Sequence, residues 1–308
     1  DDEKIAEHTI LDLVSQLDRH SSYLNKKQAR DLQTITSGKF IGIGAKLKLN
    51  DQHLHIISVM PGSPANKANL QVNDIITHIN YNPVDPENFM QQLKGNEHEP
   101  LTLSLVRTKK NIETTLTRMA IEIPSISSKQ IDDIGYIRIK LFSKHTPQEL
   151  FEAITSLTPT SEAILFDLRG NPGGLLSASV IATDYLLNNK KDPIVHINEH
   201  TNEKPIAIVA SEYDLSFGKP IFILVDKSTA SGGEIFTKAL QFYQRATVLG
   251  QRTYGKGSVQ SLIPFKDGSL LKLTTAFFTG PDGSAINDKG VKPDIHFSDP
   301  SHMLAQAL

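Results

Sequence analysis

The sequence predicts a mixed α+β (α/β) chain of several domains, and three observations lead to this prediction. The length of 308 residues suggests about two domains with ample room for a core. A helical pattern opens the chain, short strands punctuated by glycine and proline follow, and alternating strands and helices fill the rest. We therefore expect a helical segment (1–36), an inserted β-rich domain (37–119), a core of strands and helices (120–300) and a short tail (301–308).

The composition is typical of a globular protein and excludes several classes of function. Hydrophobic residues make up 39% and charged residues 21% of the chain. The net charge is −2 and no basic tract stands out, so nothing indicates nucleic-acid binding. The absence of cysteine excludes thiol catalysis, disulfides and cysteine-bound metal, and it fits an oxidising compartment outside the cytoplasm.

No apolar run is long enough to cross a bilayer, and the acidic first residues lack the hydrophobic stretch of a secretory signal. We expect either a cytosolic chain or a processed form of an exported one. Membrane association would require segments that this chain does not contain.

The first 36 residues predict two helices separated by a break. Apolar residues recur at helical spacing and indicate one buried stripe; they are Ile5, Ile10, Leu13, Val14 and Leu17. The stretch LDRHSSYL (17–24) interrupts this pattern, and NKKQARDLQ predicts a second, short helix. We expect His20 to serve in a loop or cap, because no partner motif lies beside it.

Short strands fill residues 37–119. KFIGIGAKLKL (39–49) alternates apolar and polar residues, HLHIISVM (53–60) predicts its partner strand, and Pro64 can start a short helix. Gly42 and Gly44 leave backbone N–H groups unobstructed, which suits capture of a terminal carboxylate by a peptide that adds as a strand. The same glycines would also permit a simple tight bend.

After residue 120 strands alternate with helices. GYIRIKLF (135–142) predicts a strand, residues 146–157 a helix, and AILFDL (163–168) a buried strand. This strand ends in the glycine-rich turn 169–174, before a predicted helix over 175–187. A strand, a glycine turn and a helix start form an anion site. The spacing of a phosphate-binding loop is absent, so an oxyanion hole fits better.

The stretch from Val225 to Gln260 carries the candidate chemistry. A strand over 220–225 leads to Ser231 at the start of a predicted helix (234–243), and Lys256 follows in a turn bracketed by two glycines. Serine needs a base to remove its proton, and a lysine can be that base if burial lowers its pKa. Each residue alone is common in turns or on surfaces. Together they indicate a serine–lysine hydrolase, and Gln260 lies four residues after the lysine.

Two alternatives remain open. One is a peptide-binding protein that cuts little, because a sequence does not show that Ser231 and Lys256 meet. The other is a serine hydrolase with a histidine base. Eleven histidines are present, but none lies in a motif beside Ser231, and we expect His145, His196 and His200 in loops.

The sequence resembles two known families. Ile41-Gly42-Ile43-Gly44 with GSPANKANLQVNDII resembles a PDZ domain. The motifs LDRHSSYL, SGKFIGIG, DLRGNPGG, STASGGE, TYGKGSVQ and KGVKPDI, in this order, resemble the carboxyl-terminal processing proteases, serine proteases with an inserted PDZ domain. The resemblance implies cleavage of proteins near accessible C-termini, without metal or cofactor. It also implies export, to the bacterial periplasm, the cell envelope or the chloroplast lumen, and allows an adaptor protein or a homo-oligomer as partner.

Carried over residue by residue, the resemblance implies Ser231 as nucleophile, Lys256 as general base and Gln260 as the residue that holds the lysine. It implies oxyanion donors at the N–H groups of Gly173 and Gly232. A further set of residues would bind the peptide in the PDZ-like domain, namely Gly42, Ile43 and Gly44. Binding there is expected to shift the enzyme toward an aligned active site.

Two positions depart from the family pattern. The family commonly has alanine and serine after the nucleophile, where this chain has Gly232 and Gly233. Glycine still offers its N–H, although the turn is expected to be looser. Many relatives also carry an acidic residue where Phe242 stands, so we expect no charged helper there.

Overall fold

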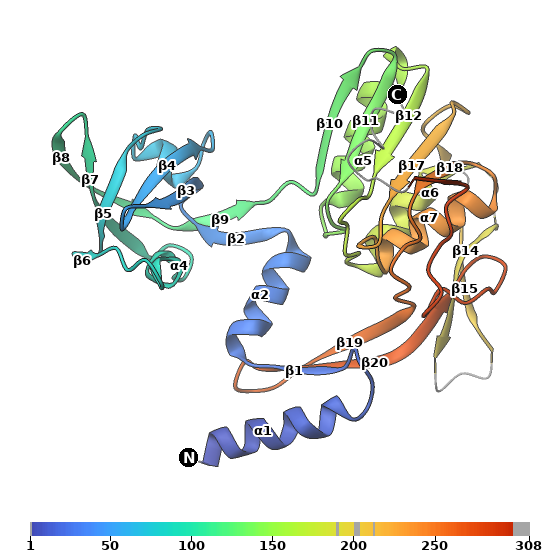
Figure 1. Cartoon of the computed structure of the whole chain (residues 1–308), viewed down its shortest axis with the longest axis horizontal. Coiled ribbons are helices and arrows are strands. Elements are labelled where there is room, and N and C mark those ends of the chain that lie inside the picture. Colours follow the sequence, from blue (N-terminus) through green and yellow to red (C-terminus); the bar gives the residue numbers. More distant parts are fainter. Residues whose placement is uncertain (1, 189–190, 200–203, 212, 298–308) are drawn as a thin grey trace. The chain divides into compact units, whose positions relative to one another are not determined.

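The computed structural model describes residues 2–188, 191–199, 204–211 and 213–297 (Figure 1). The tail expected at 301–308 lies outside the described residues. The chain divides into two compact units, one formed by 1–38 with 124–308 and the other by 39–123. The mixed α+β class with an inserted β-rich unit is confirmed.

The inserted unit, 39–123, is built on one antiparallel sheet in the order β3-β4-β5-β7-β8. Its strands are β3 (Ala45–Asn50), β4 (His53–Val59), β5 (Ile75–Ile79), β7 (Pro100–Arg107) and β8 (Lys110–Thr117), with β6 (Asn82–Pro83) paired to β5. Two short helices accompany the sheet, α3 (Pro64–Lys67) and α4 (Phe89–Leu93). Alternate apolar side chains of these strands, such as Leu54, Leu103 and Leu105, are fully buried in its core.

A separate two-stranded ribbon begins and ends this unit. Strand β2 (Lys39–Gly42) pairs antiparallel with β9 (Met119–Glu122), and Lys39 forms an ion pair with Glu122 at 3.0 Å. The two points where the chain enters and leaves the unit are therefore tied to each other (Figure 1).

The other unit contains a six-stranded sheet in the order β10-β11-β12-β17-β18-β21. Its strands are β10 (Ile126–Ile131), β11 (Ile134–Ile139), β12 (Ala163–Asp167), β17 (Ile221–Val225), β18 (Thr247–Gly250) and β21 (Ile295–His296). All neighbours are parallel except β10 and β11. Parallel strands end at the same edge, so the turns that follow β12 and β17 lie side by side.

Three helices pack with this sheet around the main core, α5 (Thr146–Leu157), α6 (Leu176–Asp184) and α7 (Gly232–Phe242) (Figure 1). Along β12 the side chains of Ile164 and Phe166 enter this core, while Leu165 between them joins a smaller cluster. This alternation is expected for a strand buried on both faces. A 3₁₀ turn (Thr158–Thr160) follows α5.

A second sheet pairs the N-terminal segment with the strands of residues 258–279. Its strands are β1 (Ser22–Leu24), β20 (Leu270–Thr279), β14 (Pro193–Glu199) and β15 (Ile206–Val209), with β19 (Ser258–Pro264) paired to β20. The turn residues Lys266-Asp267-Gly268 predict a hairpin, and strands β19 and β20 form it. Helices α1 (Asp2–Ser15) and α2 (Lys26–Ser37) flank β1, and a small pair joins β13 (Leu186–Leu187) to β16 (Tyr213–Asp214).

Several local predictions are wrong. The helix expected over 175–187 ends at Asp184, because residues 186–187 pair as β13. The break at LDRHSSYL is confirmed, but its end also forms a strand that was not expected, β1, which pairs with β20. The N-terminal stripe is not buried as a whole: Val14 is buried, but Leu13 on α1 is 61% exposed and Leu17, in the turn after α1, is 60% exposed.

Candidate active site

Ser231 lies in a strained turn between β17 and α7. Its backbone has φ 53° and ψ −116°, a region that residues with a β-carbon rarely adopt. Hydrogen bonds within this turn and to the glycine turn that follows β12 hold it in place. Asp226 accepts N–H groups from Gly170 (3.0 Å) and Thr229 (3.0 Å), and Ala230 N–H donates to the carbonyl of Asn171 at 2.9 Å. The glycine turn after β12 thus supports the turn that presents Ser231.

The buried carboxylate of Glu234 joins Ser231 to Lys256. Its Oε2 accepts the backbone N–H of Ser231 and that of Lys256, each at 2.8 Å. Its Oε1 accepts the Gly255 N–H at 2.7 Å and the Thr253 hydroxyl at 2.6 Å. The two candidate residues therefore have their backbone nitrogens within two hydrogen-bond lengths of each other, although 25 positions separate them in the sequence.

Glu234 is fully buried at 0% exposure. Burial raises the pKa of its carboxyl, and the four hydrogen bonds from Thr253, Lys256, Gly255 and Ser231 act in the opposite direction without cancelling it. Replacing a buried carboxyl that accepts four donors is costly, because each donor would lose its partner inside the protein.

Lys256 has the environment that a lysine base requires. Burial lowers the pKa of its amine, the positive charge of Lys272 lowers it further, and Glu234 opposes both. Within the described part of the chain, Lys256 Nζ makes no hydrogen bond or ion pair. A desolvated ammonium without a counter-ion favours its neutral form, which is the form that can accept a proton.

Gln260 lies close to this region but is not bonded to Lys256 among the described residues. Its Nε2 donates to Ser258 Oγ at 2.7 Å and lies 3.5 Å from Thr274 Oγ1. Both partners belong to the β19–β20 hairpin, which begins directly after Lys256. In this arrangement Gln260 bonds within the hairpin that follows the lysine, and its expected role in holding Lys256 stays a prediction.

The glycine turn approaches Ser231 so closely that a side chain would not fit. A β-carbon on Gly173 would lie 2.6 Å from Ser231 Cβ and 2.9 Å from Gly232 N. The Gly173 N–H itself donates to Asn171 Oδ1 at 2.7 Å. By contrast, the N–H groups of Gly174 and Gly232 make no hydrogen bond to any described residue. Free N–H groups beside Ser231 are what an oxyanion needs.

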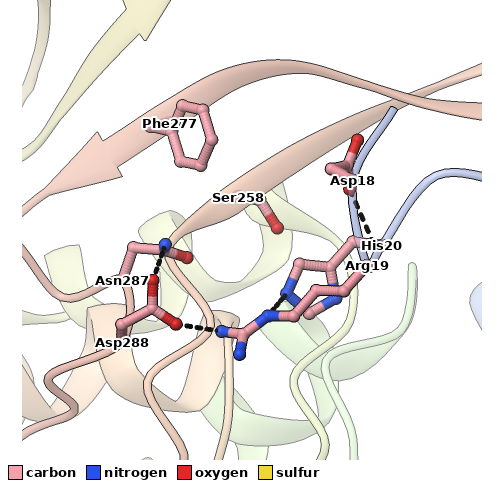
Figure 2. A pocket seen from close by; sticks show the side chains of 7 residues that line it. All are labelled: Asp18, Arg19, His20, Ser258, Phe277, Asn287 and Asp288. Carbon is pink, nitrogen blue, oxygen red and sulfur yellow. Dashed lines mark hydrogen bonds and ion pairs between the residues drawn. The ribbon is translucent and has the colours of Figure 1, made fainter. Parts of the chain in front are cut away.

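A turn of the N-terminal segment, residues 18–21, forms one wall of a pocket next to the lysine. The pocket has a volume of about 320 Å³ and is lined by Asp18, Arg19, His20, Ser258, Phe277, Asn287 and Asp288 (Figure 2). Arg19 lies between His20 and Asp288 and bonds to both (Figure 2). Burial and then the nearby charge of Lys256 lower the pKa of His20, so this histidine lies near the candidate base.

Asp18 anchors this turn to the hairpin. Its carboxylate accepts the N–H groups of His20 (2.6 Å) and Ser21 (2.9 Å) and the hydroxyl of Thr274 (3.1 Å). Burial alone would raise the pKa of Asp18, but hydrogen bonds from Ser21, His20 and Thr274 outweigh it and set the pKa at about 2. The predicted loop role of His20 is confirmed, and the loop contributes to the site.

The other histidines give little support to a histidine base. His145 precedes α5, His196 lies in strand β14 rather than in a loop, and His200 lies outside the described residues. Phe242 is 43% exposed, and its ring meets the ring of Tyr243 edge-on at a centroid distance of 4.9 Å. No group of three or more histidine, aspartate or glutamate side chains in the described ranges could hold a metal ion.

Comparison with known proteins identifies the family. Residues 133–297 match peptidase family S41, and residues 55–107 match the PDZ domain. The chain is 33% identical over 310 residues to a carboxy-terminal-processing protease of Bartonella bacilliformis, covering 97% of this chain and 71% of that protein. The chain belongs to peptidase family S41. It is thus a member of the carboxy-terminal-processing serine proteases with a PDZ domain, as its sequence motifs predicted.

Further S41 relatives agree. A probable CtpA-like serine protease of Staphylococcus aureus is 33% identical over 307 residues, covering 98% of this chain and 62% of its own length. Among solved structures, a photosystem II D1 C-terminal processing protease has a TM-score of 0.58 at 24% identity, covering 94% of this chain and 81% of that one. A putative S41 protease of Bacteroides fragilis has a TM-score of 0.57 at 18% identity, covering 94% and 82%. These two likenesses show the fold.

In the PDZ unit, the residues expected to bind peptide lie at the end of β2 and in the turn before β3. Ile43 and Gly44 are buried, and their carbonyls accept the N–H groups of Ala65 and Met60, each at 2.8 Å. A β-carbon on Gly44 would lie 2.3 Å from Ser63 Cβ, so this glycine is required by packing and by its φ of 73°. Neither Ile43 nor Gly44 donates its N–H to a described residue, and β3 is an edge strand. Both conditions suit an added peptide strand.

Sequence reasoning missed Glu234 in the S41 site, although a signal was present. Ser231 and Glu234 have the spacing of a helix capping box, Ser-x-x-Glu, in which the glutamate accepts the N–H of the serine. The second half of its role, the bonds to the lysine turn, comes from residues about 20 positions away and has no local signal.

None of the described helices is long and apolar enough to cross a membrane.

Proposed function

We propose that this chain is an endopeptidase that cuts proteins near their C-termini with Ser231 as nucleophile and Lys256 as general base. The main support for this proposal is the carboxylate of Glu234. A single oxygen of it, Oε2, accepts the backbone N–H groups of both Ser231 and Lys256. This bond pattern fixes the backbones that present the two side chains. Preorganised geometry of this kind can supply several kcal/mol of a reaction barrier, of the order of 7–11 kcal/mol in the best cases.

The reaction begins with neutral Lys256 accepting the Ser231 proton as the hydroxyl oxygen attacks the scissile carbonyl. Burial and the charge of Lys272 favour that neutral amine. The C–N bond of the tetrahedral intermediate then breaks, and the protonated lysine returns the proton to the leaving amine. Water attacks the acyl-enzyme with the same lysine as base and releases the new C-terminus.

The developing oxyanion is stabilised by the N–H groups of the two turns that meet at Ser231. Gly232 supplies one donor from the start of α7, where the helix dipole also favours negative charge. On the other side the Gly173–Gly174 backbone supplies the second. Because Asn171 already accepts the Gly173 N–H, we assign this donor to Gly174, or to Gly173 after the Asn171 side chain moves. Each donor is worth about 10²–10³ in rate.

The PDZ unit selects the substrate by its free C-terminus. The carboxylate binds at the N–H groups of Ile43 and Gly44 beside Gly42, and the peptide adds to the free edge of β3. Gln260 supports the reaction indirectly, since it holds the β19–β20 hairpin that follows the lysine turn.

A matched set of substrates and variants tests this proposal. The purified chain is incubated with an unstructured protein that has an apolar C-terminus, and the products are identified by mass spectrometry. We expect cleavage near the C-terminus, a loss of at least 10³-fold in Ser231→Ala and Lys256→Ala, and roughly tenfold weaker cleavage of the same substrate with an amidated C-terminus. Full activity of Lys256→Ala would disprove the lysine base.

Two other outcomes lead to different functions. Tight binding of the free C-terminus without cleavage would indicate a peptide-binding protein derived from such a protease. Labelling of Ser231 by diisopropyl fluorophosphate that depends on a histidine, and not on Lys256, would indicate a histidine base.

We also propose that the protein acts outside the cytoplasm, in the periplasm or cell envelope of a bacterium. The absence of cysteine agrees with an oxidising compartment, as does the family of its relatives. Fractionation of the source cells tests this, with the protein expected in the periplasmic or envelope fraction.

A further inference from the structure

The pocket beside the lysine turn lies within reach of a substrate bound at the proposed site. Two residues of its wall are bonded to the glycines on either side of Lys256. Asn287 Oδ1 accepts the N–H of Gly257 at 3.1 Å, and the N–H of Asp288 donates to the carbonyl of Gly255 at 2.9 Å. One or two residues of an extended peptide span about 3–7 Å. A substrate residue close to the bond that is cut can therefore reach this pocket (Figure 2).

The acceptor groups in the wall of this pocket already receive donors. The Asp18 carboxylate accepts backbone N–H groups and hydroxyls from the chain around it. Ser258 Oγ accepts a hydrogen bond from Gln260 Nε2 at 2.7 Å. His20 Nε2 accepts one from Arg19 Nε at 3.0 Å. A ligand with an ammonium group would therefore compete with donors that are already in place.

Donor groups in the same wall remain open. Arg19 uses its Nε on His20 and its Nη2 on Asp288, while its Nη1 makes no hydrogen bond or ion pair with any residue that the structure describes. Burial first, and then nearby positive charges, lower the pKa of His20, so its ring is neutral at pH 7. Because its Nε2 is an acceptor, the ring proton lies on Nδ1. A group that only accepts hydrogen bonds fits this wall, and an ionised carboxylate is such a group.

Arg19 already holds a carboxylate, that of Asp288 (Figure 2). The two side chains are 53% and 64% exposed. Water screens an ion pair of this kind, so Arg19 can exchange this partner or share it at little cost. Asp288 Oδ2 also accepts a hydrogen bond from Asn287 Nδ2 at 2.7 Å, which keeps the aspartate in place when Arg19 turns to another carboxylate.

A second positive charge lies close to this pocket. Lys272 on β20 pairs with Ser22 on β1, two residues after His20, and its charge also lowers the pKa of that histidine. Its ammonium makes no ion pair with the described residues. A flat guanidinium fork and a nearby ammonium together favour a planar anion.

We propose that this pocket is a subsite for a carboxylate of the substrate, with Arg19 as its specificity-determining residue. The inference rests on the proposed function, because it concerns the substrate that Ser231 cuts. The proposed function places the C-terminal carboxylate of the protein substrate at the PDZ unit. The carboxylate in this pocket therefore comes from an aspartate or glutamate side chain close to the scissile bond.

The test compares peptides that differ in one charge. A short peptide is made around a bond that the wild-type chain cuts, and glutamate and glutamine are exchanged at each position within about three residues of that bond. The two side chains have nearly the same shape, so the comparison isolates the charge. We expect kcat/KM to be about tenfold higher for glutamate at one of these positions.

Variants of the two paired residues test whether Arg19 causes this preference. In Arg19→Met the glutamate-to-glutamine ratio is expected to fall below about twofold, whereas Arg19→Lys keeps a charge and should retain a ratio above about threefold. Asp288→Asn removes the competing charge and should raise the ratio by about threefold. Asparagine tolerates the positive φ of 60° at this position. A ratio measured within one variant is insensitive to a partial loss of folded enzyme.

Arg30→Met is the matched control. Arg30 is exposed on α2, and its side chain makes no ion pair with the described residues. This variant should keep the wild-type ratio of about ten.

Amidation of the peptide separates two sources of the carboxylate. A glutamate preference that survives amidation and is lost in Arg19→Met assigns the pocket to an acidic side chain. Dependence on a free C-terminus that is lost in Arg19→Met assigns it to the end of the peptide. A wild type that cuts all these peptides at the same rate overturns the subsite, as does either preference when Arg19→Met retains it.

Failure of the subsite and failure of the proposed function give different results. If the subsite is wrong, cleavage still requires Ser231, and only the effect of the charge is missing. If Ser231→Ala cuts the peptides as fast as the wild type, or the wild type cuts no peptide, the proposed function fails and the subsite falls with it.

Discussion

The carboxylate of Glu234 accepts the backbone N–H of Lys256 at 2.8 Å with the same oxygen that accepts the N–H of Ser231. A helix cap and a distant turn thereby share one buried acceptor. The acid takes no part in the proposed proton transfer. It decides where the nucleophile and the base lie, and four predictions follow from this arrangement and its surroundings.

Glu234→Gln is expected to lower kcat by about 10²-fold with little change in KM. One of its two acceptor oxygens becomes an NH₂ group, which faces N–H or O–H donors and cannot accept from them. The free energy of unfolding should fall on the order of 3 kcal/mol, since charged hydrogen bonds are lost in the core. Steady-state kinetics and urea unfolding measure both. Glu162→Gln, an exposed control, should change neither; an active Glu234→Gln would refute the positioning role.

The kcat/KM of the wild type should rise with pH, with a midpoint below the ordinary lysine pKa of 10.5. The base must be neutral, and a lowered pKa of Lys256 brings its deprotonation to lower pH. Removing the positive charge in Lys272→Met should raise the pKa of Lys256 and move the midpoint to higher pH, with the same plateau. Lys266→Met, an exposed change at the hairpin turn, is the control. A midpoint that moves to lower pH in Lys272→Met contradicts the lysine base.

Gly173→Ala is expected to abolish activity, by more than about 10³-fold, because its β-carbon would lie 2.6 Å from Ser231 Cβ. Gly170→Ala offers a matched control in the same turn. Its φ is also positive, at 73°, but nothing lies within 4 Å of the added carbon. Both variants should lose about 1 kcal/mol of stability to the unfavourable φ, whereas only Gly173→Ala should lose activity. Equal loss in the two variants would show that backbone strain, and not the approach to Ser231, decides activity.

Asp18 should stabilise the fold in a pH-dependent way. Its pKa is about 2 in the folded chain and 3.8 for an ordinary aspartate, so the ionised form is favoured on folding. The contribution is full above pH 3.8 and is lost as the pH falls through about 2. Asp18→Asn should therefore lower Tm by roughly 3 °C at pH 7, and the difference should shrink toward pH 2. Thermal scans across this range, with Asp12→Asn as the exposed control, show whether the gap closes.

Much of the fold was predictable because its signals are local. Buried strands such as AILFDL, the hairpin around Asp267-Gly268 and the helix that follows Ser231 are all confirmed. Predictions failed where a distant partner decided the outcome. Residues 186–187 leave the helical pattern to pair with residues 213–214, and β1 forms only because β20 lies beside it.

The site was predictable in part, because some of its residues lie in short local motifs. The motifs around Ser231 and Lys256 identify the family, which the S41 and PDZ matches confirm. Their assignment as nucleophile and base stays a prediction. Gln260 lies on β19 and bonds to Ser258, and its expected role in holding the lysine also stays a prediction.

By itself the sequence determined the family, the order of the elements and the residue types that carry the chemistry, because each depends on short motifs. Only the tertiary structure decided which groups meet. Glu234 at the Lys256 backbone, Asn171 on the Gly173 N–H and Phe142 beneath Gly232 each bring together residues that share no local pattern. Hydrogen bonds and packing between distant segments depend on how the whole chain folds, and no spacing along the sequence encodes them.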